Sequence, residues 1–223
     1  MDRTAMPEVQ DLKKEKKRKA IIRASLRVFS RKGYETSALE EVAREASLAK
    51  GTLYLYFKDK EDLYFQVMLN VLERLESYVA RQILQVEDPL EKMKAVARAQ
   101  INFLANNPNY FRLFQVAFTP EMATIHKQLL EPLFEKRRRL SEFLHGLVEE
   151  GKRQKKIRGD IDTRDVVLSY MGMVNQAVQS ACLARMGKIP PEERRVSPAQ
   201  KAEAIMKILV QGIAAGSEGG SSK

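Results

Sequence analysis

The sequence predicts an all-α protein. Across the 223 residues, no stretch alternates apolar and polar side chains in the way that a half-buried strand does. Apolar residues instead recur at intervals of three and four, which is typical of amphipathic helices. Pairs such as Asp88-Pro89 and Ser197-Pro198 divide these patterns, because Ser and Asp cap helix starts and Pro fits the first turn. About nine helices are expected, three in a small amino-terminal domain and the rest in a larger bundle.

The amino-terminal domain begins with a helix that Gly33 ends. The apolar stripe of this helix consists of Ile22, Leu26 and Phe29. Ser37, followed by Glu40, is typical of a capping box in which the serine hydroxyl accepts from the Glu40 amide and the carboxylate accepts from the Ser37 amide. This pair predicts that a short helix starts at Ser37. The inward face of that helix would consist of Leu39, Val42, Ala43 and Ala46.

A second short helix is predicted from Lys50, after a tight connection at residues 47–49. Leu53 and Phe57 would face inward. The outward residues would be Lys50, Gly51, Thr52, Tyr54 and Tyr56. Lysine and threonine can bond to base edges, tyrosine hydroxyls can bond to phosphates, and glycine lets the backbone approach a duplex closely. Two short helices with such a face indicate a helix-turn-helix that reads the major groove of DNA.

A third start signal lies at Asp59, with Asp62 three residues later. Lys60 would stand in the first turn of the next helix, whose positive amino end favours a nearby DNA phosphate. The predicted DNA-binding residues are therefore Ser37, Lys50, Gly51, Thr52, Tyr54, Tyr56 and Lys60.

The run from residue 33 to residue 63 resembles the DNA-binding domain of TetR-type transcriptional regulators. The matching pieces are Gly33-Tyr34, the run ASLAKGTLY at residues 46–54, and the spacing of Phe57, Lys60 and Leu63. Members of that family carry A-G-V-S-K-G-T-L-Y at the second of these. The resemblance implies an all-helical remainder and a dimer built from the last helices.

Three positions depart from the family pattern. Ser47 replaces a turn glycine, so a left-handed backbone at this position would cost about 1 to 2 kcal/mol. Ala49 replaces the usual serine cap, which removes an acceptor worth about 1 kcal/mol. Ala38 removes a hydroxyl that family members place near a phosphate, which leaves Ser37 to make that contact.

The predicted domains are residues 1–62 for DNA binding, 63–215 for ligand binding and dimerisation, and 216–223 as a disordered Gly/Ser-rich tail. A long helix is expected from Asp62 to about Val86, and Pro132 should mark a first turn or a kink. Further helix boundaries are expected at Asp88-Pro89, Asn106, Asn107-Pro108, Thr119-Pro120, Lys156, Asp162-Thr163 and Ser197-Pro198.

Positive charge is concentrated in the amino-terminal domain. Residues 1–60 hold 15 Lys and Arg against 9 Asp and Glu, so +6 of the net +10 lies there. The run from Lys13 to Lys19 contains six basic residues and one acid. Such an arm can follow a phosphate backbone or enter a minor groove. A solvated helix start explains the run equally well.

The last two long helices predict a homodimer. Residues 166–184 are apolar on nearly every side, so this helix needs burial on more than one face. The final helix adds a stripe that can complete a four-helix interface with a symmetry mate; its members are Ala202, Ile205, Met206, Leu209 and Ile213. A core within a monomeric bundle is the alternative. A dimer would let two recognition helices read a palindrome.

The middle of the chain is the candidate ligand-binding region. The predicted lining residues are Phe103, Phe111, Phe114, Phe118, Met122, Met171, Asn175, Gln176 and Gln179. Most large apolar residues at helical spacing belong to ordinary core, so each one is as readily structural. The three amides lie in an apolar helix and need partners there. A ligand, a water or a hydrogen bond across the dimer interface would satisfy them equally well.

Enzyme activity, a cofactor and a metal site are not predicted. His126 and His145 are far apart in sequence and have no neighbouring ligand pattern, and no glycine loop suited to phosphates is present. The basic run at residues 136–139 can attract an acidic molecule such as an acyl-CoA, although a solvated helix face is the simpler explanation. A single cysteine, Cys182, and the lack of an apolar leader or membrane span predict a cytoplasmic protein.

These observations together predict a homodimeric repressor that binds a palindromic operator in double-stranded DNA. A small, largely apolar effector would release it by tilting the long helix that begins near Asp62. The alternative is a constitutive DNA-organising protein that uses the same DNA-binding domain without an effector.

Overall fold

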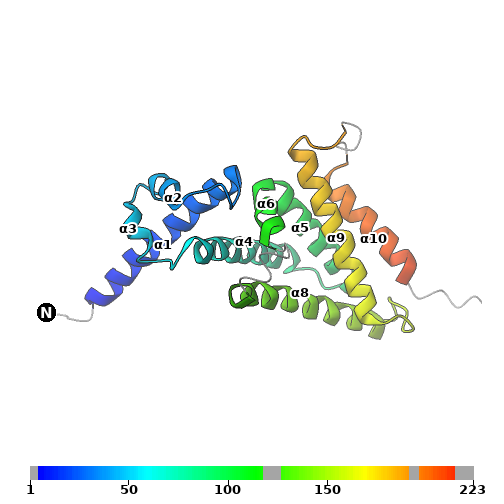
Figure 1. Cartoon of the computed structure of the whole chain (residues 1–223). Helices are drawn as coiled ribbons and strands as arrows, with labels where there is room; N and C mark the ends of the chain where they lie inside the picture. Colours follow the sequence, from blue (N-terminus) through cyan, green and yellow to red (C-terminus); the bar gives the residue numbers. More distant parts are fainter. Residues whose placement is uncertain (1–4, 118–126, 191–195, 214–223) are drawn as a thin grey trace, which may run out of the picture. The chain divides into compact units, whose positions relative to one another are not determined.

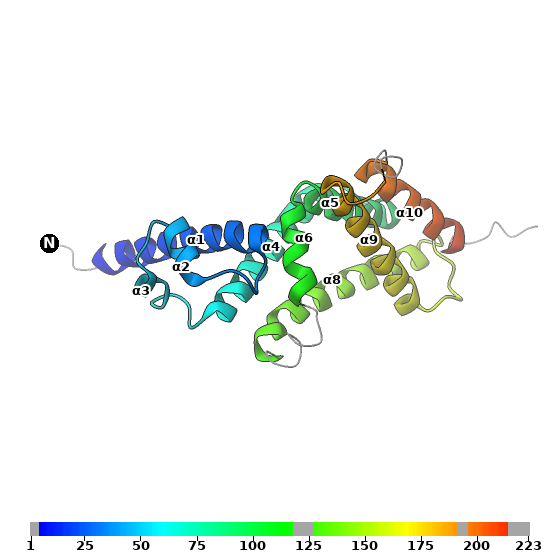
Figure 2. The same ribbon diagram turned by 45° about the horizontal axis from the view of Figure 1, so that its top comes forward.

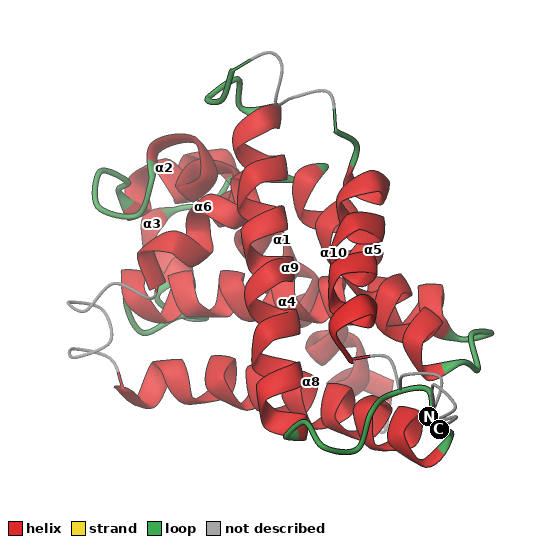
Figure 3. Cartoon of the chain, turned by 90° about the vertical axis from the view of Figure 1, so that its right-hand side faces the viewer, coloured by secondary structure: helices red, strands yellow, loops and turns green. Residues whose placement is uncertain are grey.

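The computed structural model describes residues 5–117, 127–190 and 196–213, and every regular element within these ranges is a helix (Figures 1 and 3). The helices are α1 (Ala5–Lys32), α2 (Leu39–Glu45), α3 (Lys50–Leu53), α4 (Lys60–Ile83), α5 (Pro89–Ala105), α6 (Pro108–Ala117), α8 (Lys127–Arg153), α9 (Thr163–Arg185) and α10 (Pro198–Ile213). The all-α prediction is confirmed. Over the described ranges, no helix is both long and apolar enough to cross a membrane.

The chain divides into two compact units, which we call the head and the bundle. The head comprises residues 1–73 and 112–133, and the bundle comprises residues 74–111 and 134–223. Helices α4, α6 and α8 each contribute residues to both units. The domain limits at residues 62 and 215 stay a proposal, and the tail at residues 216–223 lies outside the described ranges.

The head is built around an aromatic cluster. Phe29 of α1 meets the Tyr64 ring edge-on at 5.4 Å, and the Tyr34 and Tyr64 ring centroids lie 4.6 Å apart. Tyr64 is fully buried, and its hydroxyl donates to the Leu113 carbonyl at 2.6 Å. Because a buried hydroxyl without a partner is costly, this hydrogen bond lets Tyr64 fill the core and ties α4 to α6. Leu63, as the sequence pattern requires, is also fully buried.

In the bundle, α5, α9 and α10 pack against one another around a single apolar core. Tyr170 of α9 is buried, and its hydroxyl donates to the Met93 carbonyl of α5 at 2.7 Å. Cys182 is buried in the same core. From α8, Leu144 and Val148 complete it. The apolar stripe predicted for the last helix is found at Ala202, Ile205, Met206 and Leu209, but it is buried in the core of one chain, as in the alternative to an interface with a second copy; Ile213 lies at the helix end.

Helix starts with a side-chain acceptor lie where the sequence predicted them. The Asp62 amide donates to Asp59 at 2.8 Å, and the Glu91 amide donates to Asp88 at 2.9 Å. The Arg164 amide donates to the Asp162 carboxylate at 2.6 Å. At α10 the capping box is complete, since Ser197 and Gln200 exchange both amide hydrogen bonds.

One prediction about a helix start was wrong, and a second was only partly met. The α2 N-cap is Ala38 and not Ser37, since the helix starts one residue later than predicted; the Ser37 hydroxyl donates to the Gly33 carbonyl at 2.5 Å. Alanine has no acceptor, so only the reciprocal half of the capping box forms, from the Ala38 amide to Glu41. Of the two alternatives for Pro132, a first turn is contradicted because Pro132 lies inside α8, and a kink at this residue stays a prediction.

Ser47 takes the left-handed backbone that the family glycine would take, with φ of 56°. The Ser47 amide donates to the Arg44 carbonyl and the Leu48 amide donates to the Ala43 carbonyl, which is a complete Schellman motif at the end of α2. These two bonds offset the steric cost of a left-handed serine. The tight connection between α2 and α3 is thereby kept without glycine.

Replacement of Ser47 by glycine should stabilise the protein by about 1 kcal/mol, because glycine adopts this backbone without the steric cost. Thermal and urea unfolding would measure the change. Ser141→Gly is the matched control, since Ser141 lies inside α8 and glycine there should destabilise the helix. Equal effects of the two substitutions would contradict the strain at Ser47.

Candidate nucleic-acid interface

The candidate interface centres on residues 50–57, which we call the reading segment. Helix α3 covers only Lys50–Leu53, and turns continue the segment to Tyr56. Leu53 and Phe57 are 1% and 4% exposed, so both inward positions are confirmed. The Tyr56 and Phe57 amides both donate to the Leu53 carbonyl, which holds the turns in place. The segment is thus shorter as a regular helix than the sequence predicted, yet it is anchored at both inward residues.

The outward residues of the reading segment are accessible to different degrees. Gly51 is exposed and Tyr54 is 50% exposed, whereas Thr52 and Tyr56 are half-buried. Leu55 was missed by the sequence analysis, although its side chain is 76% exposed between the two tyrosines. A leucine flanked by outward tyrosines in a helix-turn-helix is the signal that could have identified it. An exposed apolar group here suits a thymine methyl.

Lys50 forms an ion pair that the sequence analysis also missed. The Lys50 ammonium bonds to the Glu40 carboxylate at the start of α2. This hydrogen bond lowers the pKa of Glu40 and raises the pKa of Lys50, so both groups are charged at neutral pH. Both side chains are about half exposed, and solvent therefore screens the pair strongly. The pair connects the two helices of the helix-turn-helix at the surface that would face DNA.

Two of the predicted DNA contacts, Ser37 and Lys60, already bond to other groups of the protein. Ser37 is 4% exposed, and its hydroxyl is already bonded to the Gly33 carbonyl. The Lys60 ammonium donates to the Glu35 carbonyl at 3.1 Å and lies 4.4 Å from the centre of the Tyr34 ring. Burial, with the nearby Glu61 carboxylate, raises the pKa of Tyr34 well above its usual range. Lys60 therefore holds the loop before α2. A DNA phosphate could bond to the Lys60 ammonium only alongside the Glu35 carbonyl.

The acids of α2 neutralise basic residues of α1. Glu45 bonds to Arg27 at 2.6 Å and lies 3.6 Å from Arg31, and Glu41 pairs with Lys32. These hydrogen bonds lower the pKa of Glu41 and Glu45. The acidic outer face of α2 is thus paired, and the positive charge at the carboxyl end of α1 is largely cancelled.

The predicted ligand-binding residues divide between the two units. In the bundle, the Phe103 ring lies between Tyr78 and Tyr110, with centroids 5.6 and 5.8 Å away, and Arg74 donates to the Tyr110 hydroxyl at 3.1 Å. Phe111 and Met171 pack against the bundle core. Phe114 is half-buried in the head. Phe118 and Met122 lie outside the described residues.

The amides of α9 are not buried within one chain. Asn175 and Gln176 are exposed, and Gln179 is half-buried. The apolar sequence around these amides indicated burial, but only one face of α9 packs against α5 and α10. Their outer face also carries Leu168, which is 55% exposed. Of the three alternatives for these amides, their exposure fits water or an interface between subunits better than a ligand within the core of one chain.

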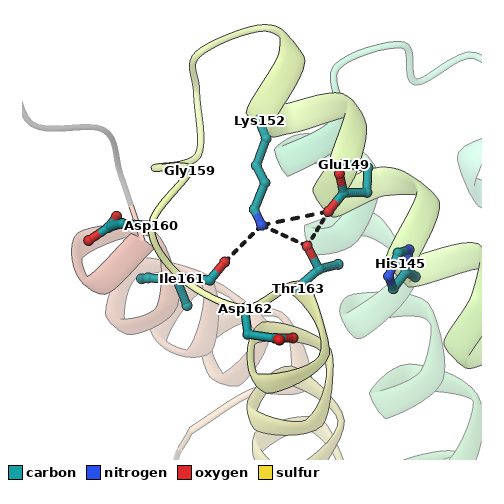
Figure 4. A pocket seen from close by; sticks show the side chains of 8 residues that line it. All are labelled: His145, Glu149, Lys152, Gly159, Asp160, Ile161, Asp162 and Thr163. Carbon is teal, nitrogen blue, oxygen red and sulfur yellow. Dashed lines mark hydrogen bonds and ion pairs between the residues drawn. The ribbon is translucent and has the colours of Figure 1, made fainter.

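An open pocket of about 510 Å³ lies at the end of α8 and the start of α9 (Figure 4). Lys152 donates to the Ile161 carbonyl and to the Thr163 hydroxyl, both at 2.7 Å, and Thr163 bonds to Glu149. The hydrogen bond from Thr163 lowers the pKa of Glu149. These contacts satisfy one another and fix the loop before α9. His145 lines it, but no metal-binding group of three ligands occurs among the described residues.

Two family models match this chain, and known transcriptional regulators are similar to it. Residues 21–67 match the family model described as bacterial regulatory proteins, tetR family, and residues 86–179 match the one described as tetracyclin repressor-like, C-terminal domain. The transcriptional regulator HbdR of Aromatoleum sp. (strain CIB) is 39% identical over 79 residues, which are 35% of this chain and 34% of HbdR. That similarity therefore spans about a third of either protein.

Two solved structures share most of the fold. FadR from Bacillus subtilis, in complex with stearoyl-CoA, has a TM-score of 0.68 and 22% identity, over 87% of this chain and 98% of that one. AibR, in complex with isovaleryl coenzyme A and operator DNA, has a TM-score of 0.67 and 21% identity, with the same coverage.

Replacement of Glu40 by glutamine should strengthen binding to any DNA duplex by roughly two- to fivefold at low salt, because it removes a negative charge from the DNA-facing surface and frees Lys50. Fluorescence anisotropy with operator and random duplexes would measure it. Glu87→Gln, which changes an exposed carboxylate in the bundle, is the control. Weaker binding by Glu40→Gln would show instead that the pair orients Lys50 for contact.

Proposed function

Because the chain belongs to the TetR family of DNA-binding transcriptional regulators, we propose that it is a homodimeric repressor of a palindromic operator, released by a small, largely apolar effector. The observation that carries this proposal is the reading segment, whose outward residues are held over the buried Leu53 and Phe57. A surface of hydroxyl, amine and phenol groups over a rigid apolar base suits the edges and phosphates of a major groove.

The proposed roles follow from exposure and chemistry. Lys50 and Thr52 contact base edges, and Gly51 admits the backbone close to the duplex. Tyr54 and Tyr56 donate to phosphates. Ser37 and Lys60 remain proposed contacts, although both would act through groups that also hold the loop before α2.

The exposed faces of α9 and α10 support a homodimer. Leu168 is 55% exposed and Ile208 is 63% exposed, while Gly172 and Ala204 are exposed small residues on the same two helices. Small and apolar residues on two adjacent helices suit a four-helix interface with a second copy. Asn175 and Gln176 would then find hydrogen-bond partners across the interface. The two reading segments would occupy major grooves about 34 to 36 Å apart.

An acyl thioester of coenzyme A is the effector class that we propose first. The acyl-CoA ligands of FadR and AibR support it, as does the row of aromatic rings at Tyr78, Phe103 and Tyr110. On α8, Arg137 is an exposed cation that can attract a coenzyme A phosphate. Lys136, Arg138 and Arg139 are paired with Glu76 or Glu135, so most of that basic run forms a solvated face.

Release requires that the effector bind more tightly to the DNA-free state than to the DNA-bound state. Helix α4 supplies residues to both units, so a tilt of this helix links them. The alternative function, a constitutive DNA-organising protein, uses the same head and lacks any such ligand response.

Thr52→Ala should reduce discrimination between the operator and mismatched operators by about 1 to 3 kcal/mol, with little effect on binding to random duplex, because threonine is proposed to contact a base edge. Genomic fragments selected by the purified protein would supply the operator, and competition binding would measure the ratio. A uniform loss across all duplexes would contradict base recognition by Thr52. Absence of preference for any genomic fragment would overturn the proposed function.

An acyl-CoA effector should release the operator complex and raise the unfolding temperature of the free protein. At 100 times its dissociation constant, stabilisation of about 2.7 kcal/mol is expected. Titration of CoA thioesters of increasing acyl length would measure both effects, with free coenzyme A as the control for the nucleotide part. If no thioester or other small apolar molecule weakens the complex, the constitutive alternative is favoured.

A further inference from the structure

We propose that the amino-terminal turns of α1 form a second DNA-binding element, which contacts phosphates beside the groove that the reading segment occupies. We call this element the basic extension; it comprises residues 13–17 and contains Lys13, Lys14, Lys16 and Lys17. The inference rests on the proposed function, since it requires that the head bind DNA.

The basic extension continues a helix face that is otherwise buried. Positions 14, 17, 21, 24 and 28 follow one stripe of α1 at intervals of three and four. Ile21, Ala24 and Val28 on this stripe are at most 1% exposed, whereas Lys14 and Lys17 are exposed. The inner face of α1 therefore changes from apolar core to lysine where the rest of the head stops covering it. A partner that covers this face must accept positive charge.

The charges of the basic extension are not neutralised by the head. At the other end of α1, Arg27, Arg31 and Lys32 pair with carboxylates of α2. Lys13, Lys14, Lys16 and Lys17 have no acidic partner among the described residues, and the one acid in the run, Glu15, lies 3.4 Å from Lys19. The lysines of α1 that lack an acidic partner thus lie in its first turns.

Arg18 fixes this charge beside the reading segment. The Arg18 guanidinium lies 5.5 Å from the centre of the Phe57 ring, at the end of that segment, and it donates to Gln66 of α4 at 2.5 Å. The next turn toward the amino terminus carries Lys14 and Lys17 on an open helix surface. In two views of the molecule, the first turns of α1 run on past α3 (Figures 1 and 2). A duplex that meets the reading segment therefore passes the basic extension.

Polynucleotide phosphate fits the extension better than a membrane surface does. Residues 11–19 contain one apolar side chain, Leu12, which is 59% exposed. Helices that lie in a bilayer interface need a broad apolar face opposite the basic one. A rigid row of lysines without such a face suits a linear array of phosphates.

The test replaces Lys14 and Lys17 together by alanine in the full chain, which preserves helix propensity. The double variant should bind both operator and random duplex at least about tenfold more weakly, because phosphate contacts carry no sequence information. The slope of log affinity against log salt should fall by roughly 3 to 4 for a dimer, since each lost phosphate contact removes about 0.9. Arg98→Ala with Lys188→Ala removes the same charge from the bundle and should leave the slope unchanged.

Each outcome decides the inference. Suppose that the wild type binds its operator and the double variant has the same affinity and the same salt slope. The basic extension would then be overturned, while the proposed function stands. Equal losses in the lysine variant and in the bundle control would also overturn it, since net charge alone would explain the effect. Loss of binding to vesicles of anionic phospholipid, with DNA binding intact, would assign the extension to lipid. A wild type without operator preference would instead refute the proposed function.

Discussion

The reading surface depends on the burial of Leu53 and Phe57. A four-residue helix has too few backbone hydrogen bonds to form alone, and α3 also lacks a side-chain cap, because its N-cap is Ala49. Its geometry must therefore come from tertiary contacts. The buried side chains of Leu53 and Phe57 supply these tertiary contacts, and the Arg18 guanidinium packs over the Phe57 ring. The outward direction of Tyr54 and its neighbours is thus set by the core of the head.

The same core explains why α4 begins where it does. At the start of α4, the Lys60 ammonium donates to the Glu35 carbonyl in the loop that leads into α2, and Asp59 caps the helix by accepting from the Asp62 amide. Tyr64, one turn later, joins the aromatic cluster with Phe29 and Tyr34. Any tilt of α4 that accompanies effector binding would act on this cluster and on the loop together. This arrangement connects the effector hypothesis to a specific set of contacts.

The sequence predicted features whose causes lie within one helical turn. Asp88, Asp162 and Ser197 cap helices as expected, because each acceptor and its amide are two or three residues apart. The cap at Ser37 was wrong because α2 starts one residue later, at the Ala38 cap, and the Ser37 hydroxyl is directed back to the Gly33 carbonyl one turn earlier. The pattern of apolar spacing alone could not fix the helix start to a single residue.

Features that depend on contacts between helices could not be predicted. Glu40 and Lys50 are ten residues apart and meet only because the turn at Ser47 folds α3 back toward the start of α2. Asn175 and Gln176 lie in an apolar sequence, yet burial of α9 depends on where α5 and α10 pack. Their exposure follows from the positions of α5 and α10, which the sequence pattern does not give.

The distribution of charge in the head has a further physical consequence. Local pairing with α2 cancels the cations at the carboxyl end of α1 and engages Lys50. Attraction to phosphates is long in range and independent of sequence, whereas base recognition requires short, directed bonds. A head with fewer unpaired cations around the reading segment gains less from random duplex, and its bound state depends more on directed contacts. In the proposed complex with DNA, the acids of α2 would therefore favour specificity at the expense of total affinity, and the unpaired lysines of the basic extension would restore affinity without changing which bases are read.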